Sequence, residues 1–255
     1  MNAVVITVLL AMAADPPAGG AVDGVRPPGI RPSTMRILSM TAESEPQGMD
    51  GKSLALLGTG DQVADDLARW ATLAGGPCPW LPDGKGAIVA GPEAIRTQRE
   101  FGDFQLHLEF NLPQVSDSFG QGKANSGVLI HGAYELAILD SFGLPPKIDG
   151  CGSIYRRLAP DVNAAEPPGL WQTYDVVFRA PRFADDGSVR ELPRVTVLLN
   201  GRFVQNNVEI AGRTPSSPTA PLEAADAPPL PATGPIVLQG NAQGVRFRNI
   251  WVRVP

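Results

Sequence analysis

The sequence predicts an all-β fold, a jelly-roll β-sandwich with a short helical or irregular segment at its N-terminal side. The chain holds 28 glycines and 26 prolines in 255 residues, a density that favours turns and disfavours long helices. From residue 87 to the C-terminus, short apolar or alternating segments recur. Turn signals separate these segments, as in proteins whose two sheets pack their apolar faces together.

The N-terminal region predicts an export signal. Residues 3–14 are apolar and end in Ala11-Met12-Ala13, which fits the small-x-small pattern of signal-peptidase cleavage, although no basic residue precedes them. We interpret residues 1–14 as a signal peptide, with an uncleaved anchor or a loose apolar terminus as the alternative. Residues 15–48 are rich in Pro, Gly, Ala and Ser without periodicity and predict a linker or poorly ordered segment. The protein is therefore expected in the periplasm, at the cell surface or outside the cell.

The folded domain is expected to span residues 49–255. It begins with a helix predicted around residues 62–73, where Val63, Leu67 and Trp70 fall at helical spacing.

The strands follow in order. Residues 104–112 alternate cleanly between an apolar face and a polar face of Gln105, His107, Glu109 and Asn111. Residues 126–131 and 134–140 predict a hairpin with Gly132-Ala133 in a type II′ turn, and Asn200-Gly201 predicts a type I′ turn in a second hairpin. Further strands are expected in residues 87–91, 171–180, 234–240 and 245–254, and a long proline-rich loop in residues 212–235.

Charge and cysteine content exclude several classes of function. The net charge is −5, from 21 basic and 26 acidic residues, and no basic run exists, which argues against nucleic acid as a partner. Cys78 and Cys151 permit at most one disulfide, or two thiols buried apart, and with two histidines they disfavour a Cys/His zinc site. Beyond a possible N-terminal anchor, no stretch predicts a membrane span.

Eight motifs in a fixed order resemble the 3-keto-disaccharide hydrolase domain family, over roughly residues 49–255. They are F-x-L-x-L-E-F (104–110), N-S-G-V (125–128), Y-E-L-x-I-L-D (134–140), C-G-S-I-Y (151–155), W-x-x-Y-D-V-V-F-R-A-P (171–181), N-G-R-F-V-x-N-N-V (200–208), G-P-I-V-L-Q (234–239) and V-R-F-R-N-I-W-V (245–252).

The resemblance implies a concanavalin A-like jelly roll in carbohydrate metabolism that cleaves glycosides already oxidised to a ketone at sugar carbon 3. Such a ketone acidifies the hydrogen on carbon 2, so a base can remove it and the group on carbon 1 then leaves. This site needs a base, a group that holds the enolate oxygen, and an acid for the leaving group. Two positions depart from the family pattern. Ala137 stands where the family has glutamine, and Gly240-Asn241 where it has aspartate and histidine, so specificity or activity could be altered.

Three residues are the catalytic candidates. Glu135 stands between apolar strand residues, where burial would raise its pKa and suit it as base or acid; a surface or structurally paired glutamate is the alternative. Glu109 is the second carboxylate, with an exposed outer face as its alternative. His131, where the family often has arginine, could hold the substrate or the enolate oxygen, or could be a solvent-facing turn residue.

The substrate-binding candidates are Arg248, Asn125, Asp140, Tyr155 and Gln239. Arg248 could instead form a structural salt bridge, Asp140 could cap a loop, and Tyr155 could simply pack. Trp80, Trp171 and Trp251 could stack on a sugar, although core positions are the commoner case. We expect Glu109, Glu135 and Arg248 to converge in one cleft.

These observations predict an exported enzyme that cleaves a small oligosaccharide or glycoside oxidised at carbon 3, by proton abstraction at carbon 2 and elimination at carbon 1. The alternatives are a non-catalytic sugar-binding module and a surface protein with a vestigial groove. A divalent metal is possible, and no organic cofactor is expected.

Overall fold

Two antiparallel sheets carry the fold. The computed structural model describes residues 53–115, 118–215, 231–241 and 243–255. All of them belong to one compact unit, Glu43–Pro255. The signal peptide and linker predicted in residues 1–14 and 15–48 lie outside the described residues.

The larger sheet has eight strands, and its central strands are the long alternating segments of the sequence. Its order is β13 (Arg202–Glu209), β12 (Arg194–Leu199), β9 (Trp171–Arg179), β6 (Phe104–Asn111), β15 (Arg246–Arg253), β4 (Ile88–Val89) and β3 (Leu81–Pro82), with β1 (Ser53–Leu57) also paired to β15.

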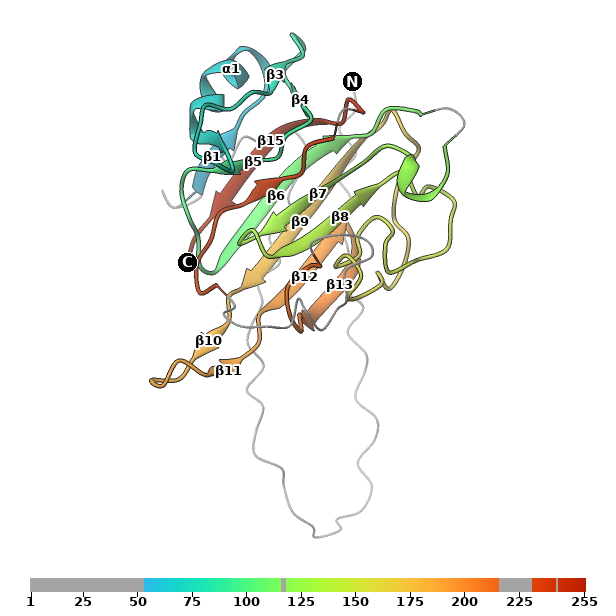
Figure 1. Ribbon diagram of the computed structural model, residues 1–255. Coiled ribbons are helices and arrows are strands. Elements are labelled where there is room, and N and C mark those ends of the chain that lie inside the picture. The colour runs from blue at the N-terminus through green and yellow to red at the C-terminus, as the bar shows by residue number, and fades with distance from the viewer. Residues whose placement is uncertain (1–52, 116–117, 216–230, 242) are drawn as a thin grey trace, which may run out of the picture. The chain divides into compact units, whose positions relative to one another are not determined.

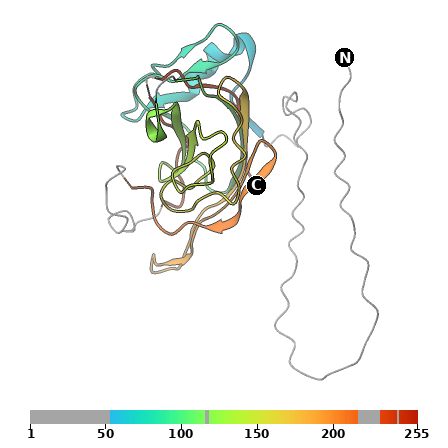
Figure 2. The same ribbon diagram turned by 90° about the vertical axis from the view of Figure 1, so that its right-hand side faces the viewer.

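The smaller sheet has five strands and lies over the larger one (Figures 1 and 2). Its order is β2 (Trp70–Thr72), β5 (Ile95–Thr97), β14 (Val237–Leu238), β7 (Asn125–Ile130) and β8 (Tyr134–Leu139). A separate two-stranded ribbon, β10 (Arg182–Phe183) with β11 (Val189–Glu191), extends beyond the larger sheet in Figure 1. The predicted all-β, concanavalin A-like sandwich is confirmed.

The core lies between the two sheets, and strand alternation decides which residues enter it. In β6 the even-numbered residues from Phe104 to Phe110 join the apolar core, together with Leu136 and Ile138 of β8. The side chain of Tyr174 of β9 spans the core between the two sheets, and its hydroxyl donates a hydrogen bond to the Ala137 carbonyl of β8 (2.6 Å). Successive strand residues point to opposite faces, so the odd-numbered residues of β6 and β8 lie on the two outer faces of the sandwich.

The helix predicted over residues 62–73 is largely wrong. The structure has one α-helical turn, α1 (Val63–Asp66), between the 3₁₀ turns η1 (Gly60–Gln62) and η2 (Leu67–Arg69). The chain then enters β2, where Trp70 pairs with Thr97 and its indole nitrogen donates to the Leu56 carbonyl (3.0 Å). Sheet pairing and burial of this indole override the helical spacing of the sequence. A further 3₁₀ turn, η3 (Gly120–Gly122), precedes β7.

One of the two predicted turns is confirmed and one is displaced. Asn200 and Gly201 both have positive φ (52° and 75°) and join β12 to β13 as a two-residue type I′ turn requires. In the β7–β8 hairpin the positive-φ pair is His131-Gly132 (54° and 60°), and the Ala133 amide donates to the Ile130 carbonyl. The turn therefore starts one residue earlier than predicted, and its backbone is of the type I′ kind, not type II′.

Both cysteines are free thiols in this structure. Cys78 is half-buried, whereas Cys151 is buried and its sulfur lies 3.3 Å from the Tyr174 hydroxyl. The two thiols stay apart, as one of the two sequence-based alternatives proposed.

Candidate functional site

A pocket of about 260 Å³ lies against the smaller sheet at β8. Glu135 and Ala137 reach it from the outward-facing positions of β8, and Asn125 comes from the start of β7. The described residues that line it with polar groups are Gln121, Asn125, Ser126, Glu135, Asp149, Tyr155 and Gln239. Four of the predicted site residues therefore meet in one place: Glu135, Asn125, Tyr155 and Gln239.

Glu135 is the buried carboxylate of this pocket. The residue is 7% exposed, and within the described part of the chain its carboxylate has no hydrogen-bond or ion-pair partner. Burial raises the pKa of Glu135 from 4.5 to about 7. A carboxyl group with a pKa near neutrality can accept a proton at physiological pH and return it, as the sequence predicted for this residue.

Gly127 of β7 provides the space that Glu135 occupies. A Cβ atom at residue 127 would lie 2.9 Å from both Cγ and Oε1 of Glu135, closer than non-bonded carbon atoms approach. The Glu135 side chain therefore lies directly over this glycine, which positions its carboxylate.

We expect Gly127→Ala to reduce turnover of a sugar substrate at least about tenfold, because small displacements of a reacting group are costly. The flexible Glu135 side chain can move away from the new methyl group, so the midpoint of thermal unfolding should change little. Steady-state kinetics and a thermal melt measure the two effects. An unchanged rate would show that the position of Glu135 is not critical.

Two irregular segments cover the free edge of β8 and form the wall of the pocket. The Tyr155 amide donates to the Glu135 carbonyl (2.9 Å), and the Ala137 amide donates to the Ser153 carbonyl (3.0 Å). Next to them, the Thr214 hydroxyl accepts from the Glu135 amide (2.8 Å). These bonds pair the backbone N–H and C=O groups at the edge of β8 and place Tyr155 beside Glu135.

Amide side chains close one end of the pocket. Asn125 donates through Nδ2 to the carbonyls of Gln121 and Lys123, and its Oδ1 accepts from Asn241 (3.2 Å). Asn241, which stands where the family has histidine, therefore belongs to a structural amide network. By contrast, the Gln239 side-chain amide has no partner within the described residues and remains available to a ligand.

The charge of the pocket is negative. Glu135 and Asp149 are both carboxyl-bearing residues, and none of the described residues that line the pocket is Lys, Arg or His. The pKa of the Tyr155 phenol is raised by burial and by the negative charges of Glu135 and Asp149. The cationic group that we expected for an enolate oxygen is therefore not among these lining residues.

Asp149 and Gln121 were missed by sequence reasoning. Gln121 is in the short 3₁₀ turn η3 and Asp149 is in an irregular loop, and in neither segment does a sequence periodicity mark the residues that share a face. The single signal for Asp149 is its position two residues before the C-G-S-I-Y motif.

Glu109 and Arg248 do not join Glu135, so the expected common cleft is wrong. Glu109 is on the outward-facing side of β6, in the larger sheet, and the apolar core separates it from the outer face of β8. Its carboxylate accepts hydrogen bonds from Arg248 Nε (2.6 Å) and Asn249 Nδ2 (2.8 Å). Arg248 also lies 4.0 Å from the centre of the Trp171 ring. The structural salt bridge, the alternative for Arg248, is the arrangement that the structure contains.

His107 completes this charged cluster. Its Nδ1 lies 2.7 Å from Asp175, and its ring stacks on Trp251 at a centroid distance of 5.4 Å. Burial alone would lower the pKa of His107, but Asp175 and Glu109 raise it to about 9. Burial alone would raise the pKa of Glu109, but its hydrogen bonds with His107, Asn249 and Arg248 lower it to about 2. Both groups are therefore charged at neutral pH.

His131 lies in the β7–β8 turn and is 4% exposed, so it is not the solvent-facing residue of the alternative interpretation. Its ring nitrogens lie within 3.3 Å of the carbonyls of Pro231 and Gly102, and its ring contacts Phe178. Burial lowers its pKa. His131 does not line the pocket of Glu135, and its contacts are those of a packed structural residue.

Asp140 and the tryptophans also lie outside the lining of the pocket. Asp140 is buried and pairs with Lys123 Nζ at 3.1 Å. Trp80 is buried against Phe247, and its indole nitrogen donates to the Glu93 carbonyl.

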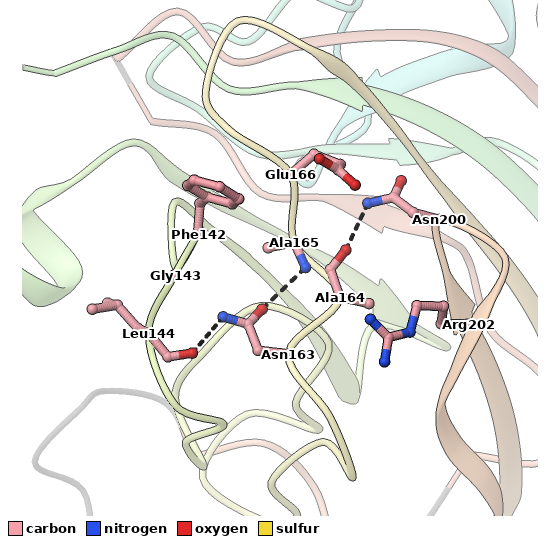
Figure 3. A pocket seen from close by; sticks show the side chains of 9 residues that line it. All are labelled: Phe142, Gly143, Leu144, Asn163, Ala164, Ala165, Glu166, Asn200 and Arg202. Atoms are coloured by element: carbon pink, nitrogen blue, oxygen red, sulfur yellow. Dashed lines mark hydrogen bonds between the residues drawn. The ribbon is translucent and has the colours of Figure 1, made fainter.

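A second hollow, of about 420 Å³, lies beside the loop that follows β8 (Figure 3). Its amide groups are already bonded within the protein: Asn163 Nδ2 donates to the carbonyls of Ser141 and Leu144, and Asn200 Nδ2 donates to that of Ala164. These amides hold the loops together, and the hollow offers a ligand few free polar groups beyond the exposed Glu166 and Arg202.

No group of three or more metal-binding side chains comes together in the part of the chain that the structure describes. None of the helices in that part is long and apolar enough to cross a membrane.

Solved structures with this fold include candidate glycosyl hydrolases. A candidate glycosyl hydrolase from Parabacteroides distasonis ATCC 8503 superposes with a TM-score of 0.68 and 32% identity, over 80% of this chain and 84% of that one. A second candidate glycosyl hydrolase from the same organism has a TM-score of 0.52 and 20% identity, over 73% and 88% of the two chains. A search of curated proteins finds no match.

The sandwich and the neighbour of 32% identity indicate a carbohydrate-active protein. A family model, the 3-keto-alpha-glucoside-1,2-lyase-like domain, matches residues 61–253. The chain belongs to this family, as the order of its motifs indicated.

Proposed function

We propose that this protein cleaves glycosides that carry a ketone at sugar carbon 3, and that Glu135 is the base. The observation that supports the proposal is the buried Glu135 carboxyl group in a polar pocket, without a partner among the described residues and with its pKa raised to about 7. The family of the chain supplies the substrate class.

The chemistry follows from the acidity of the substrate. The carbon 3 ketone makes the carbon 2 hydrogen removable, and Glu135 takes that proton. The enolate that forms expels the group on carbon 1, which leaves an enone, and water then adds across carbons 1 and 2. Because no Lys, Arg or His is among the described lining residues, the neutral Gln239 amide is the proposed donor to the enolate oxygen.

The pH dependence should report Glu135. We expect kcat/KM for a 3-keto-disaccharide to rise with pH and level off above pH 7, with a midpoint near 7, because the base works in its ionised form. Below the midpoint the rate should fall about tenfold per pH unit. Initial rates in overlapping buffers from pH 5 to 9 measure this profile, and a level profile across that range would assign the base elsewhere.

The direct test is incubation with a small panel of 3-keto-disaccharides, followed by product analysis by NMR. Parallel reactions with added divalent cations and with a chelator test whether turnover requires a metal; no organic cofactor is proposed. Release of both sugars from at least one 3-keto substrate, and not from its unoxidised parent, is the expected result. A panel without turnover would overturn the enzymatic proposal.

A non-catalytic sugar-binding module is the second candidate function. The observations that favour it are the lack of a cation among the described lining residues and the use of Asn241 in an amide network. Saturable sugar binding without turnover in the same panel would establish this function. The vestigial groove of the third interpretation would show neither binding nor turnover.

We propose further that the protein is exported and that its partner is a small oligosaccharide or glycoside. N-terminal sequencing of the mature protein from fractionated cells tests export, and cleavage after residue 13 or 14 is the expected result.

A further inference from the structure

We infer that Tyr155 is the proton donor to the leaving oxygen at sugar carbon 1. The inference rests on the proposed function and adds a second catalytic residue to the pocket of Glu135.

The backbone places Tyr155 directly beside Glu135. Leu136 of β8 and Ile154 form an antiparallel bridge, and the Tyr155 amide donates to the Glu135 carbonyl (2.9 Å). Glu135 and Tyr155 are therefore opposite each other on the pocket side, where facing side chains have Cβ atoms roughly 4.5–5.5 Å apart. Both side chains line the same pocket, so one sugar ring can contact both.

Few hydroxyl protons are available in this pocket. Among the described lining residues, Ser126 and Tyr155 carry a side-chain hydroxyl. The Ser126 hydroxyl donates to the Gln239 carbonyl at 2.7 Å, so its proton is already used in a hydrogen bond within the protein. The Tyr155 hydroxyl has no partner within the described residues, so it is free to donate to a ligand.

Burial, together with the carboxylates of Glu135 and Asp149, keeps the Tyr155 phenol protonated at neutral pH. Burial and the neighbouring carboxylates raise its pKa above 10, so ionised Glu135 and neutral Tyr155 coexist at neutral pH. This is the pair of protonation states that elimination requires: a base ready to accept and an acid ready to donate.

Glu135 and Tyr155 together account for every proton that moves in the elimination and in the addition of water. Glu135 takes the proton from carbon 2, and the electron pair of that bond forms the double bond between carbons 1 and 2. The bond from carbon 1 to the leaving oxygen breaks, and that oxygen takes the proton of Tyr155. In the second half, the Tyr155 phenolate takes a proton from water, the hydroxide adds to carbon 1, and Glu135 returns its proton to carbon 2. The net reaction consumes one water, and both residues regain their starting states.

Tyr155→Phe tests this role through the leaving group. Two 3-keto-glucosides are compared, one with a methoxide and one with a 4-nitrophenolate leaving group, because the second group leaves without needing a proton. We expect kcat for the methyl glycoside to fall at least about tenfold more than kcat for the nitrophenyl glycoside. A purely structural role of the tyrosine would lower both rates equally.

Tyr134→Phe is the matched control. Tyr134 is adjacent to Glu135 on the opposite face of β8, and its buried hydroxyl lacks a hydrogen-bond partner in the described structure. Its removal should leave both rates unchanged and should not lower the thermal midpoint, because an unpaired buried hydroxyl does not stabilise the fold. Equal losses on the two substrates in Tyr155→Phe, or no loss on either, would overturn the role of Tyr155 while leaving the proposed function intact. A wild-type protein without activity on either glycoside would overturn both.

Discussion

Glu135→Gln should lower kcat on a 3-keto-glycoside by at least ~10²-fold, since general acid–base groups contribute ~10²–10⁴-fold. Glutamine keeps the shape of the side chain but cannot accept the carbon 2 proton. Single-turnover measurements would separate this chemical step from product release. A variant that keeps more than about a tenth of the wild-type rate would show that another group is the base.

Glu166→Gln is the matched control for this substitution. Glu166 is an exposed carboxylate beside the second hollow, outside the pocket of Glu135. The same chemical change at this residue should leave kcat unchanged. A loss there similar to that of Glu135→Gln would point to a general electrostatic effect.

Glu135→Gln should also stabilise the folded protein above neutral pH. The pKa of Glu135 is about 7 in the folded state and 4.5 ordinarily, so between these values the folded state binds more protons than the unfolded one. The contribution of Glu135 to stability is therefore greatest below pH 4.5 and decreases as pH rises towards 7, by about 3 kcal/mol at about 1.4 kcal/mol per pKa unit. Glutamine does not ionise, so its advantage over wild type in urea unfolding should be large at pH 8 and small at pH 5. Such a gain in stability with a loss of rate is typical of a strained functional group.

The sequence predicted the strands of the sandwich more reliably than the position of each site residue. Alternation over residues 104–112 identified which side chains of β6 share a face, and the structure agrees. Alternation does not say which sheet a strand enters, because sheet order depends on pairing between distant segments. Glu109 and Glu135 were therefore expected together, although β6 and β8 belong to different sheets.

The register of the β7–β8 turn also depends on contacts with distant segments, which the local sequence does not report. The triplet His131-Gly132-Ala133 can form a tight turn in two registers, and glycine at residue 132 suits both. The structure selects the register in which His131 takes positive φ and its ring packs against Phe178. Burial of the imidazole accompanies this choice, and no local signal in the sequence reports it.

Loss of the cation at residue 248 should destabilise the larger sheet. In Arg248→Leu, the Glu109 carboxylate stays buried, with its side chain 4% exposed, but loses its guanidinium partner. Removing one partner of a fully buried pair costs ~3–5 kcal/mol. The Arg248 side chain is 32% exposed, and Asn249 and His107 remain near the carboxylate, so we expect a smaller loss of about 2 kcal/mol. Urea unfolding at pH 7 measures it.

Arg194→Leu is the control for that prediction. The Arg194–Glu209 pair also bridges neighbouring strands of the larger sheet, but both side chains are exposed: Arg194 by 35% and Glu209 by 51%. Exposed pairs contribute ~0–1 kcal/mol, so this variant should lose at most about 1 kcal/mol. The contrast arises from Glu109, whose burial makes its charge costly once Arg248 is gone.

Glu109→Gln combined with Arg248→Leu removes both charges and should recover part of the loss. A double variant as unstable as Arg248→Leu alone would mean that packing of Arg248 on Trp171, and not its charge, supports the sheet. In either case, sugar turnover should persist in the folded fraction, because the apolar core separates this cluster from the pocket of Glu135.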